Sequence, residues 1–579
     1  MSSLYSGVRG RCCIARLSAL AVKSVDGHRQ TPRLGYTRPC KDIAHWEGRR
    51  ERGSIASSIS VNAHFILNNG FKAQLANLTK SYGLASPRFF KKTHTDGLHL
   101  AKPTNASAQK LQWRALSSLQ TPPVLDPIDP VGPALTVLAF AVCLVGGVMG
   151  YVYITDTRAL AYKWAVMPAL HYLCDPEDSH KLSIWLARHS LVPSERTSDD
   201  DVLATKIWGN KLTNPIGLAA GYDKHAEAVD ALFGFGFGMV EIGSVTPKPQ
   251  ESYHIHILNQ KLPGNPKPRM FRLPQDKAVI NRYGFNSEGH EAVAQRLNVR
   301  IRKFLYKHHV PSSTSNSDSI ASSILSPLEW LNTSSTVSSE PSSATNNTIN
   351  RSLHTDRLLG VNLGKNKTTD ADSDDDYISG ITTMSPYADY IVINISSPNT
   401  PGLRSLQSCI PIERLLRSAK KERDALPKHH QPPLVVKIAP DLSPLELSDI
   451  AAVVESVGID GVIISNTTIS RPDTLQSDAA ISGETGGLSG APVLPLALHT
   501  VSEFYRLTGG RVPIIGCGGI QTAADALKFA KAGAVVVQVY TALGYQGPGL
   551  VHDIKADLTR ALKADGVSWS QVVGADHRK

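Results

Sequence analysis

The sequence predicts an α/β protein whose main body is a (β/α)8 barrel. From Lys206 onward one unit repeats: an apolar, β-branched run ends in Gly, Ser, Asn or Thr, and helix-length sequence follows. Continuously apolar runs are typical of parallel strands buried on both faces, and eight of them fit a closed barrel. A doubly wound open sheet is the alternative, although it seldom needs eight parallel strands at this spacing. The eight predicted strands are Pro215–Ala219, Met239–Ser244, Leu359–Leu363, Tyr390–Ile395, Leu434–Ile438, Gly461–Ser465, Val512–Gly516 and Ala534–Tyr540.

A long uncharged segment precedes the barrel. No charged residue occurs between Asp129 and Asp156, and the apolar run 131–154 is long enough to span ~30 Å of hydrocarbon. We therefore expect one transmembrane helix there, and the alternative is a helix buried in a protein core.

Two amphipathic helices are expected at 157–195, between this segment and the barrel. Arg158–Cys174 carries apolar residues at helical spacing, and a second helix has strong start signals in Asp175 as N-cap and Pro176 at its first position. Beside a membrane span, such a hairpin would lie on the bilayer surface. Capping of the following domain explains the same pattern equally well.

The basic residues concentrate in the first 120 residues of the chain. This part holds 19 Lys and Arg against 5 Asp and Glu, whereas the remainder holds 42 against 45. Residues 1–25 contain four basic residues, several serines and no acidic one, which is typical of a mitochondrial transit peptide; a disordered basic tail is the alternative. We expect no fold up to about residue 118. Because the remainder is nearly neutral, it has no electrostatic footprint for nucleic acid.

Polar residues recur at the carboxyl ends of the predicted strands, where barrel enzymes place their active sites. Four of them are amides, which donate and accept hydrogen bonds as recognition of a planar imide edge requires. Two are lysines at strand ends, and a glycine pair follows the seventh strand, where barrels commonly hold a phosphate on backbone N–H groups. These residues are Asn362, Asn394, Asn399, Asn466, Lys224, Lys437, Gly518 and Gly519. Singly each is an ordinary turn residue, but together they predict a site for a flavin and a pyrimidine.

Six segments, in order and at the right strand positions, closely resemble the class 2 dihydroorotate dehydrogenases. The similarity runs from about Met167 to the end of the chain. The segments are Asn214–His225, Val240–Pro249, Ile280–Asn286, Gly360–Asn366, Asn394–Thr400 and Glu484–Gly490.

The resemblance implies oxidation of dihydroorotate to orotate in pyrimidine biosynthesis. Ser397 would be the general base that takes the proton from C5 while hydride leaves C6 for FMN. A serine hydroxyl is a poor base at neutral pH, so a water- or Thr-assisted proton relay is expected. The soluble class uses cysteine as base, and Cys409 lies beyond the loop. The implied substrate-binding residues are Lys224, Asn281, Arg282, Tyr283, Gly284, Phe285, Asn394, Asn399, Asn466 and Thr467.

The resemblance also implies the cofactor site and the electron acceptor. Ubiquinone would reoxidise the FMN through a tunnel formed by the helices before the barrel, with polar positions at His180, Arg272 and Tyr540. The protein would be anchored by a single span in the mitochondrial inner membrane, with its catalytic domain, residues 201–579, facing the intermembrane space. The implied FMN-binding residues are Ala220, Gly221, Ser244, Asn362, Asn394, Lys437, Ser465, Ser489, Gly490, Gly518, Gly519, Tyr540 and Thr541.

The chain departs from the family pattern at three places. Ser252–Pro263 interrupts a stretch that is continuous in the family, either as a real loop or as a gene-model error. The Ser-, Thr- and Asn-rich insertion 311–355 is expected to be disordered. Ser465 stands where the family usually has Thr.

Other functions are less consistent with the pattern. The run Asp370–Asp374 begins like an EF-hand but lacks its later glycine and acidic residue, so no metal is expected. Two alternatives remain open: a phosphate-binding barrel lyase or isomerase without flavin, and a non-catalytic membrane scaffold.

Overall fold

The computed structural model describes residues 131–250, 254–255, 260–261, 265, 267–307, 350–400 and 402–578. The predicted leader 1–118 and most of the insertion 311–355 lie outside these residues. So do the side chains of residues 131–134, 136 and 137.

Eight parallel strands form a closed barrel, which confirms the predicted fold and excludes the open sheet. The eight strands coincide with the eight predicted runs within one or two residues, and β15 pairs with β3 to close the ring. All carry buried residues from end to end except for single partly exposed positions in β4 and β15. The strands are β3 (Ile216–Leu218), β4 (Met239–Val245), β9 (Leu358–Leu363), β10 (Tyr390–Asn394), β11 (Leu434–Ile438), β12 (Gly461–Ile464), β14 (Ile514–Cys517) and β15 (Ala534–Val539).

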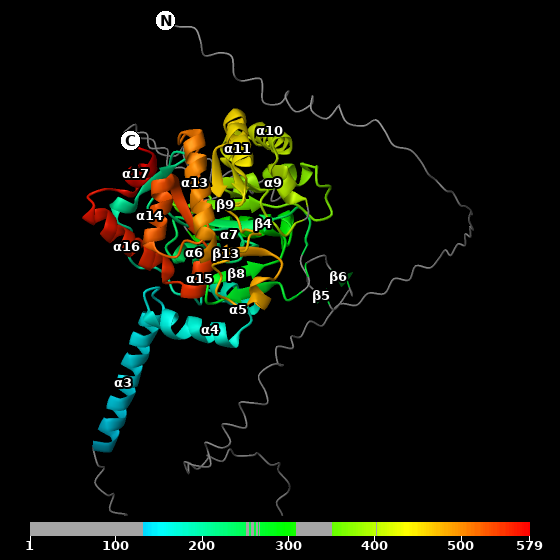
Figure 1. Cartoon of the computed structure of the whole chain (residues 1–579). Helices are drawn as coiled ribbons and strands as arrows, with labels where there is room; N and C mark the ends of the chain where they lie inside the picture. Colours follow the sequence, from blue (N-terminus) through cyan, green and yellow to red (C-terminus); the bar gives the residue numbers. More distant parts are fainter. Residues whose placement is uncertain are drawn as a thin grey trace, which may run out of the picture. The chain divides into compact units, whose positions relative to one another are not determined.

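A helix follows each barrel strand and covers the outside of the barrel (Figure 1). Each presents apolar residues to the strands, and α11 also shows why the chain turns where it does. Ser443 caps its first turn reciprocally with Glu446, and Gly458 ends it in the left-handed conformation at φ +74°. The helices are α6 (Val229–Gly234), α7 (His290–Lys307), α9 (Asp375–Met384), α10 (Cys409–Ala425), α11 (Pro444–Val457), α13 (Leu494–Thr508), α14 (Ala523–Ala532) and α16 (Leu550–Ala564).

A three-stranded antiparallel sheet lies outside the barrel and was not predicted from the sequence. Its strands are β7 (Met270–Leu273), β8 (Ala278–Asn281) and β13 (Gly487–Gly490), in the order β13-β8-β7. Figure 1 shows β8 and β13 on the same side of the barrel as α15 (Thr541–Gln546) and α5 (Pro176–Arg188). Segments about 200 residues apart in the sequence therefore meet beside the strand ends.

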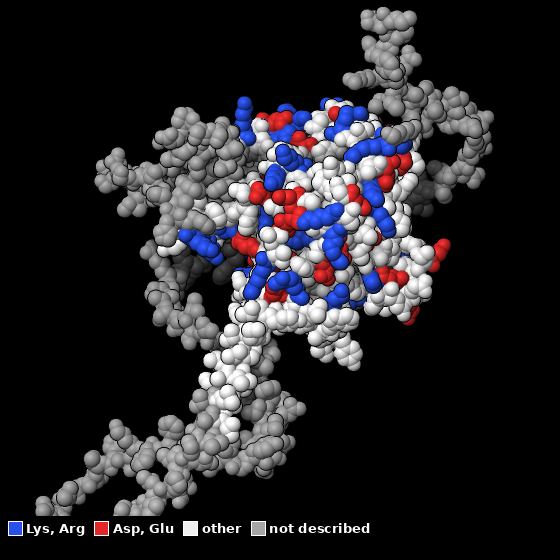
Figure 2. Space-filling view, turned by 90° about the vertical axis from the view of Figure 1, so that its left-hand side faces the viewer, with Lys and Arg blue, Asp and Glu red and all other residues white. Residues whose placement is uncertain are grey.

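The helices before the barrel begin where the sequence predicts. They are α3 (Val131–Ile154), a π-helical turn at Tyr162–Val166, α4 (Met167–Leu173) and α5. The carboxylate of Asp175 accepts a hydrogen bond from the N–H of Glu177 and caps α5, as expected. The described apolar side chains of α3 are exposed, and in Figure 2 they form an uncharged rod, whereas Lys, Arg, Asp and Glu are interspersed over the barrel. Among the residues that the structure describes, however, no helix was identified as sufficiently long and apolar to cross a membrane. The predicted span is therefore not confirmed.

The two insertions differ from expectation where the structure describes them. The inserted segment after β4 contains a short antiparallel pair, β5 (His254–Ile255) and β6 (Gln260–Lys261). The insertion predicted as disordered up to Thr355 ends earlier. Arg351 and Ser352 are buried, and their N–H groups donate to the carboxylate of Asp389 at 2.5 and 2.8 Å. A buried carboxylate needs such donors, and this requirement orders residues 350–355.

Candidate active site

A cavity of about 1210 Å³, its open mouth included, lies at the carboxyl ends of the barrel strands and under the small sheet. Most of the residues predicted from the sequence line it, although they come from seven barrel strand ends and from β8 and β13. The predicted residues that line it are Ala220, Gly221, Lys224, Ser244, Asn281, Tyr283, Gly284, Phe285, Asn394, Ser397, Asn399, Lys437, Ser465, Asn466, Thr467, Ser489, Gly490, Gly518, Gly519, Tyr540 and Thr541.

The amide of Asn394 is the centre of a polar network on one wall of the cavity. Its Nδ2 donates to Ser244 Oγ at 3.0 Å and to Asn362 Oδ1 at 3.1 Å. Its Oδ1 accepts hydrogen bonds from Ser396 Oγ at 3.1 Å and from Asn466 Nδ2 at 3.3 Å. Asn362 itself does not line the cavity; it is fully buried and donates to Glu241. It therefore orients cavity residues from behind.

Ser397 lies in the loop after β10 and faces the cavity with 7% of its surface exposed. Its Oγ accepts a hydrogen bond from the N–H of Asn399 at 3.4 Å. Asn399 in turn donates to the carbonyl of Asn281, at the end of β8, at 3.1 Å. The serine is thus held between the barrel and the small sheet.

Lys224 and Tyr283 face each other in the cavity, with the Lys224 Nζ 3.8 Å from the centre of the tyrosine ring. Arg282 differs from its neighbours in the sequence because its side chain does not line the cavity. Its Nη1 pairs with Glu484 at 2.7 Å, and its guanidinium lies over the ring of Phe271. The structure thus brings Tyr283, but not Arg282, to the site.

Lys437 is a buried cation without a partner. It is 4% exposed, it lines the cavity, and no hydrogen bond or ion pair joins its ammonium to any residue that the structure describes. A buried charge in this state is costly unless a ligand compensates it. The site therefore fits a ligand with an electronegative edge beside Lys437.

The opposite part of the cavity is shaped for close approach of a ligand to the backbone. Gly518 and Gly519 have φ angles of +133° and +78°, which favour glycine. A Cβ on Gly519 would lie 2.7 Å from the backbone nitrogen of Leu494. Ser489 and Thr541 face the same space, and the Thr541 hydroxyl donates to Ser489 Oγ at 2.9 Å. Bare backbone with hydroxyl groups is a common phosphate cradle.

A second, mainly apolar cavity of about 1110 Å³ lies between α4, α5 and the barrel. His180, Arg272 and Tyr540 line it as predicted, and Met270, Val279, Tyr540 and Thr541 line both cavities. Burial and the nearby Lys224 lower the pKa of His180 to about 3, so that the imidazole is neutral. Because its Nε2 donates to the carbonyl of Tyr222 at 2.8 Å, its Nδ1 is left as an acceptor.

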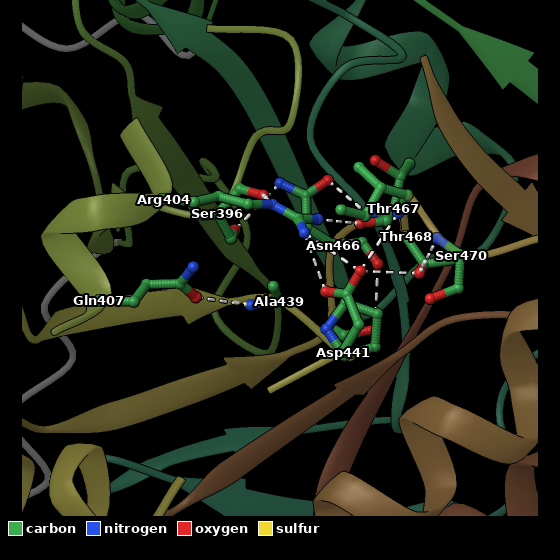
Figure 3. Close-up of polar contacts among 12 residues, drawn as sticks. Ser396, Arg404, Gln407, Ala439, Asp441, Asn466, Thr467, Thr468 and Ser470 are labelled. Atoms are coloured by element: carbon green, nitrogen blue, oxygen red, sulfur yellow. Dashed lines mark hydrogen bonds and ion pairs between the residues drawn. The ribbon is translucent and has the colours of Figure 1, made fainter. Parts of the chain in front are cut away.

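Arg404 ties the Ser397 loop to the neighbouring strand ends (Figure 3). Its Nε donates to the carbonyl of Ser396 at 3.3 Å and its Nη2 to the carbonyl of Thr467 at 3.0 Å. Its Nη1 pairs with both oxygens of Asp441, which also accepts a hydrogen bond from Thr468 Oγ1 at 2.8 Å. One guanidinium therefore fixes the backbone on either side of the cavity wall.

Several cavity residues were missed in the sequence. Gln538 and Cys517 stand inside apolar strand runs, and Met270 and Val279 belong to the unpredicted sheet. A polar residue in an otherwise apolar barrel strand is the one signal that identifies Gln538, whose Nε2 donates to the buried Glu241 at 2.7 Å. Among the described residues, no cluster of acidic, His or Cys side chains is arranged to hold a metal ion.

Comparison with known proteins agrees with this geometry. The family model described as dihydroorotate dehydrogenase matches residues 202–562. The protein named dihydroorotate dehydrogenase (quinone), mitochondrial, from Schizosaccharomyces pombe is 45% identical over 422 residues, which cover 73% of this chain and 87% of that protein. The protein of the same name from Mus musculus is 44% identical over 437 residues, 75% of this chain and 95% of its own.

A solved structure gives the same result. The crystal structure of DHODH in complex with ferulenol from Eimeria tenella has a TM-score of 0.58 and 38% sequence identity, and the match covers 70% of this chain and 96% of that one. The family model spans more than half of the chain, and the relatives are well above 30% identical over most of their length. The chain therefore belongs to the dihydroorotate dehydrogenase family, a family of flavin-dependent enzymes.

Proposed function

We propose that this protein oxidises dihydroorotate to orotate in pyrimidine biosynthesis, with FMN as cofactor and a quinone as electron acceptor, in the mitochondrion. One observation carries the proposal: the donor cavity, with its serine and ring of amides, adjoins a separate apolar cavity, and the two share Tyr540. A purified, yellow protein whose extracted cofactor is FMN is expected. A colourless protein that still consumes dihydroorotate would contradict it.

The cavity offers two features that suit FMN. Lys437 would compensate the electronegative edge of the ring, and Gly518, Gly519 and Ser489 would hold the phosphate. Ala220, Gly221, Ser244, Ser465, Gly490, Tyr540 and Thr541 would complete the site. Bound there, FMN supplies the two-electron acceptor for the substrate.

Ser397 would take the proton from C5 of dihydroorotate. It faces the cavity and sits in a loop fixed by Asn399 and Arg404. A neutral hydroxyl must pass the proton on. Thr400, whose buried Oγ1 has no hydrogen-bond partner among the described residues, would receive it directly or through water.

Amides would recognise the pyrimidine ring by its alternating donors and acceptors. Asn281, Asn394, Asn399 and Asn466 line one cavity together with Thr467 and Lys224. Asn466 Oδ1 already accepts the N–H of Thr467 at 2.8 Å, and its Nδ2 donates to Ser396 Oγ at 3.0 Å. The network therefore sets the direction of each amide before the substrate binds.

Replacing Arg404 by lysine is expected to slow flavin reduction by dihydroorotate by about 10- to 100-fold, because misplacement of reacting groups by ~1 Å has effects of this size. Lysine keeps the charge beside Asp441 but cannot reach both carbonyls with a rigid fork. Stopped-flow absorbance would measure the rate. Arg417→Lys, which alters an exposed pair with Glu413 on α10, is the matched control. Equal rates for the two variants would contradict the positioning role.

The acceptor side would serve a lipid-soluble quinone. Neutral His180 and Arg272 would contact its polar ring, and the apolar walls would take its tail. We propose that α3 anchors the protein in the inner membrane, with the catalytic domain on the intermembrane-space side, and that α4 and α5 lie at the bilayer surface. Exposed Trp164, Tyr172 and Leu173 support this arrangement.

Deleting residues 1–156 is expected to leave flavin reduction by dihydroorotate unchanged. The same deletion should impair turnover with a long-chain quinone held in vesicles, because the acceptor is concentrated in the bilayer. A short-chain, water-soluble quinone should support both forms equally. Equal rates with the vesicle-bound quinone would contradict anchoring through this segment.

A further inference from the structure

The first turn of α5 is joined to the small sheet by a buried ion pair. Arg269, just before β7, donates from Nη2 to Glu177 Oε1 at 2.8 Å and from Nε to Glu177 Oε2 at 3.0 Å. Both side chains are only 3 to 4% exposed. Burial acts to raise the pKa of Glu177, but hydrogen bonds from Arg269 and Lys181 lower it to about 2, so the carboxylate stays charged.

Arg269 also fixes Tyr283, which lines the donor cavity. Its guanidinium carbon lies 4.7 Å from the centre of the tyrosine ring. Its carbonyl accepts a hydrogen bond from the N–H of Arg282 at 2.9 Å, so the backbone next to Tyr283 is held as well. The side chain and the main chain of Arg269 therefore place the same aromatic ring.

The ring of Tyr283 in turn limits where the Lys224 ammonium can lie. Nζ is 3.8 Å from the ring centre, and a cation at this distance is attracted to the π face. Lys224 and Tyr283 line the donor cavity, whereas Glu177 and Arg269 do not. A chain of contacts thus runs from α5, through two residues outside the cavity, to a cation inside it.

We propose that α5 belongs to the dihydroorotate site as well as to the acceptor cavity: the Glu177–Arg269 pair is a positioning device that sets Tyr283 and Lys224. This inference rests on the proposed function. The same helix supplies His180 and Ser183 to the acceptor cavity. The donor site is therefore incomplete without α5, although α5 contributes no residue to its lining.

Glu177→Gln tests the proposal in the full-length holoenzyme. The carboxamide keeps the shape but lacks the charge and one acceptor, so Arg269 no longer has its two-point partner. Dissociation of orotate, followed by equilibrium binding, is expected to weaken by about 10- to 100-fold, together with a fall in the rate of flavin reduction. Reoxidation by a short-chain quinone should stay at the wild-type rate.

Arg188→Ala is the matched control. Arg188 also joins α5 to the barrel, through Glu227 at 2.9 Å, but it is exposed and does not contact Tyr283. This variant should bind orotate like the wild type. A loss that is equal in both variants, or equal in both half-reactions, would show general loosening of the helix and would overturn the proposal.

Arg269→Lys keeps the test decisive if Glu177→Gln fails to fold. It preserves the charge beside Glu177 but removes the planar fork that lies against Tyr283. Weakened orotate binding with intact flavin is expected, and wild-type binding would overturn the inference. A wild-type enzyme that is not reduced by dihydroorotate would instead overturn the proposed function, so the two failures are distinguishable.

Discussion

Replacing Ser397 by alanine is expected to slow flavin reduction by dihydroorotate by about 10²- to 10⁴-fold, the usual contribution of a positioned general base. The bound flavin and the fold should be retained. The reason is local: Ser397 Oγ faces the cavity and accepts one weak hydrogen bond from Asn399, so its loss removes little structure. Anaerobic stopped-flow mixing measures the rate.

Two controls separate catalysis from structure. Ser405→Ala removes an exposed hydroxyl that donates to a carbonyl in the following 3-10 turn, outside the cavity, and should leave the rate unchanged. Ser397→Cys restores an ionisable group at the same place and should recover part of the lost rate, more at higher pH. A rate for Ser397→Ala within about tenfold of the wild type would exclude Ser397 as the base.

Replacing Lys437 by methionine is expected to have opposite effects on the flavin-free and the flavin-bound protein. Without flavin, the variant should melt ~2 °C or more above the wild type, because a buried ammonium without a partner is removed. Flavin affinity should fall by about 10- to 150-fold, which corresponds to the loss of one charge-assisted hydrogen bond. Thermal unfolding and flavin titration of the apoprotein measure the two effects.

Lys365 provides the matched control for this prediction. It is another buried lysine near a strand end, but its Nζ donates to the carbonyls of Ala371 and Ser373, each at 2.7 Å. Lys365→Met should therefore lower the melting temperature and leave flavin affinity unchanged. If Lys437→Met also lowers the melting temperature of the apoprotein, Lys437 has a structural partner and the assignment is wrong.

The barrel could be predicted because its strands are buried on both faces, which leaves continuous apolar runs in the sequence. Strand ends are then known, and parallel strands bring their ends together, so Asn394, Asn466 and Lys437 could be assigned to one site. The N-cap of α5 could be predicted for a similar reason, since Asp175 and Pro176 act within one turn.

The small sheet could not be predicted, because its strands are four residues long and β13 pairs with β8 across about 200 residues. Long-range pairing leaves no local pattern. The role of Arg282 was misjudged for a related reason: adjacent residues at a strand end point to opposite sides, and a motif does not show which side faces the cavity. Neither the Arg404 clamp nor the Glu177–Arg269 pair has any signature in local sequence.

The arrangement explains how one chain can serve a polar donor and an apolar acceptor. Tyr540 lines both cavities, and its ring lies 5.9 Å from that of Tyr222 and 6.5 Å from that of His180. Burial raises the pKa of Tyr540 well above its ordinary value, so the phenol stays neutral between the two sites. An aromatic partition of this kind keeps the substrate and the quinone apart.

The most direct measurement is an anaerobic titration of the purified protein in two steps. Dihydroorotate is added first, and the account predicts that the flavin absorbance bleaches with one equivalent per flavin and that orotate is formed. A short-chain quinone is added next and should restore the absorbance, again with one equivalent. Flavin that does not bleach with dihydroorotate, or that bleaches but is not restored by quinone, would contradict a single chain with coupled donor and acceptor sites.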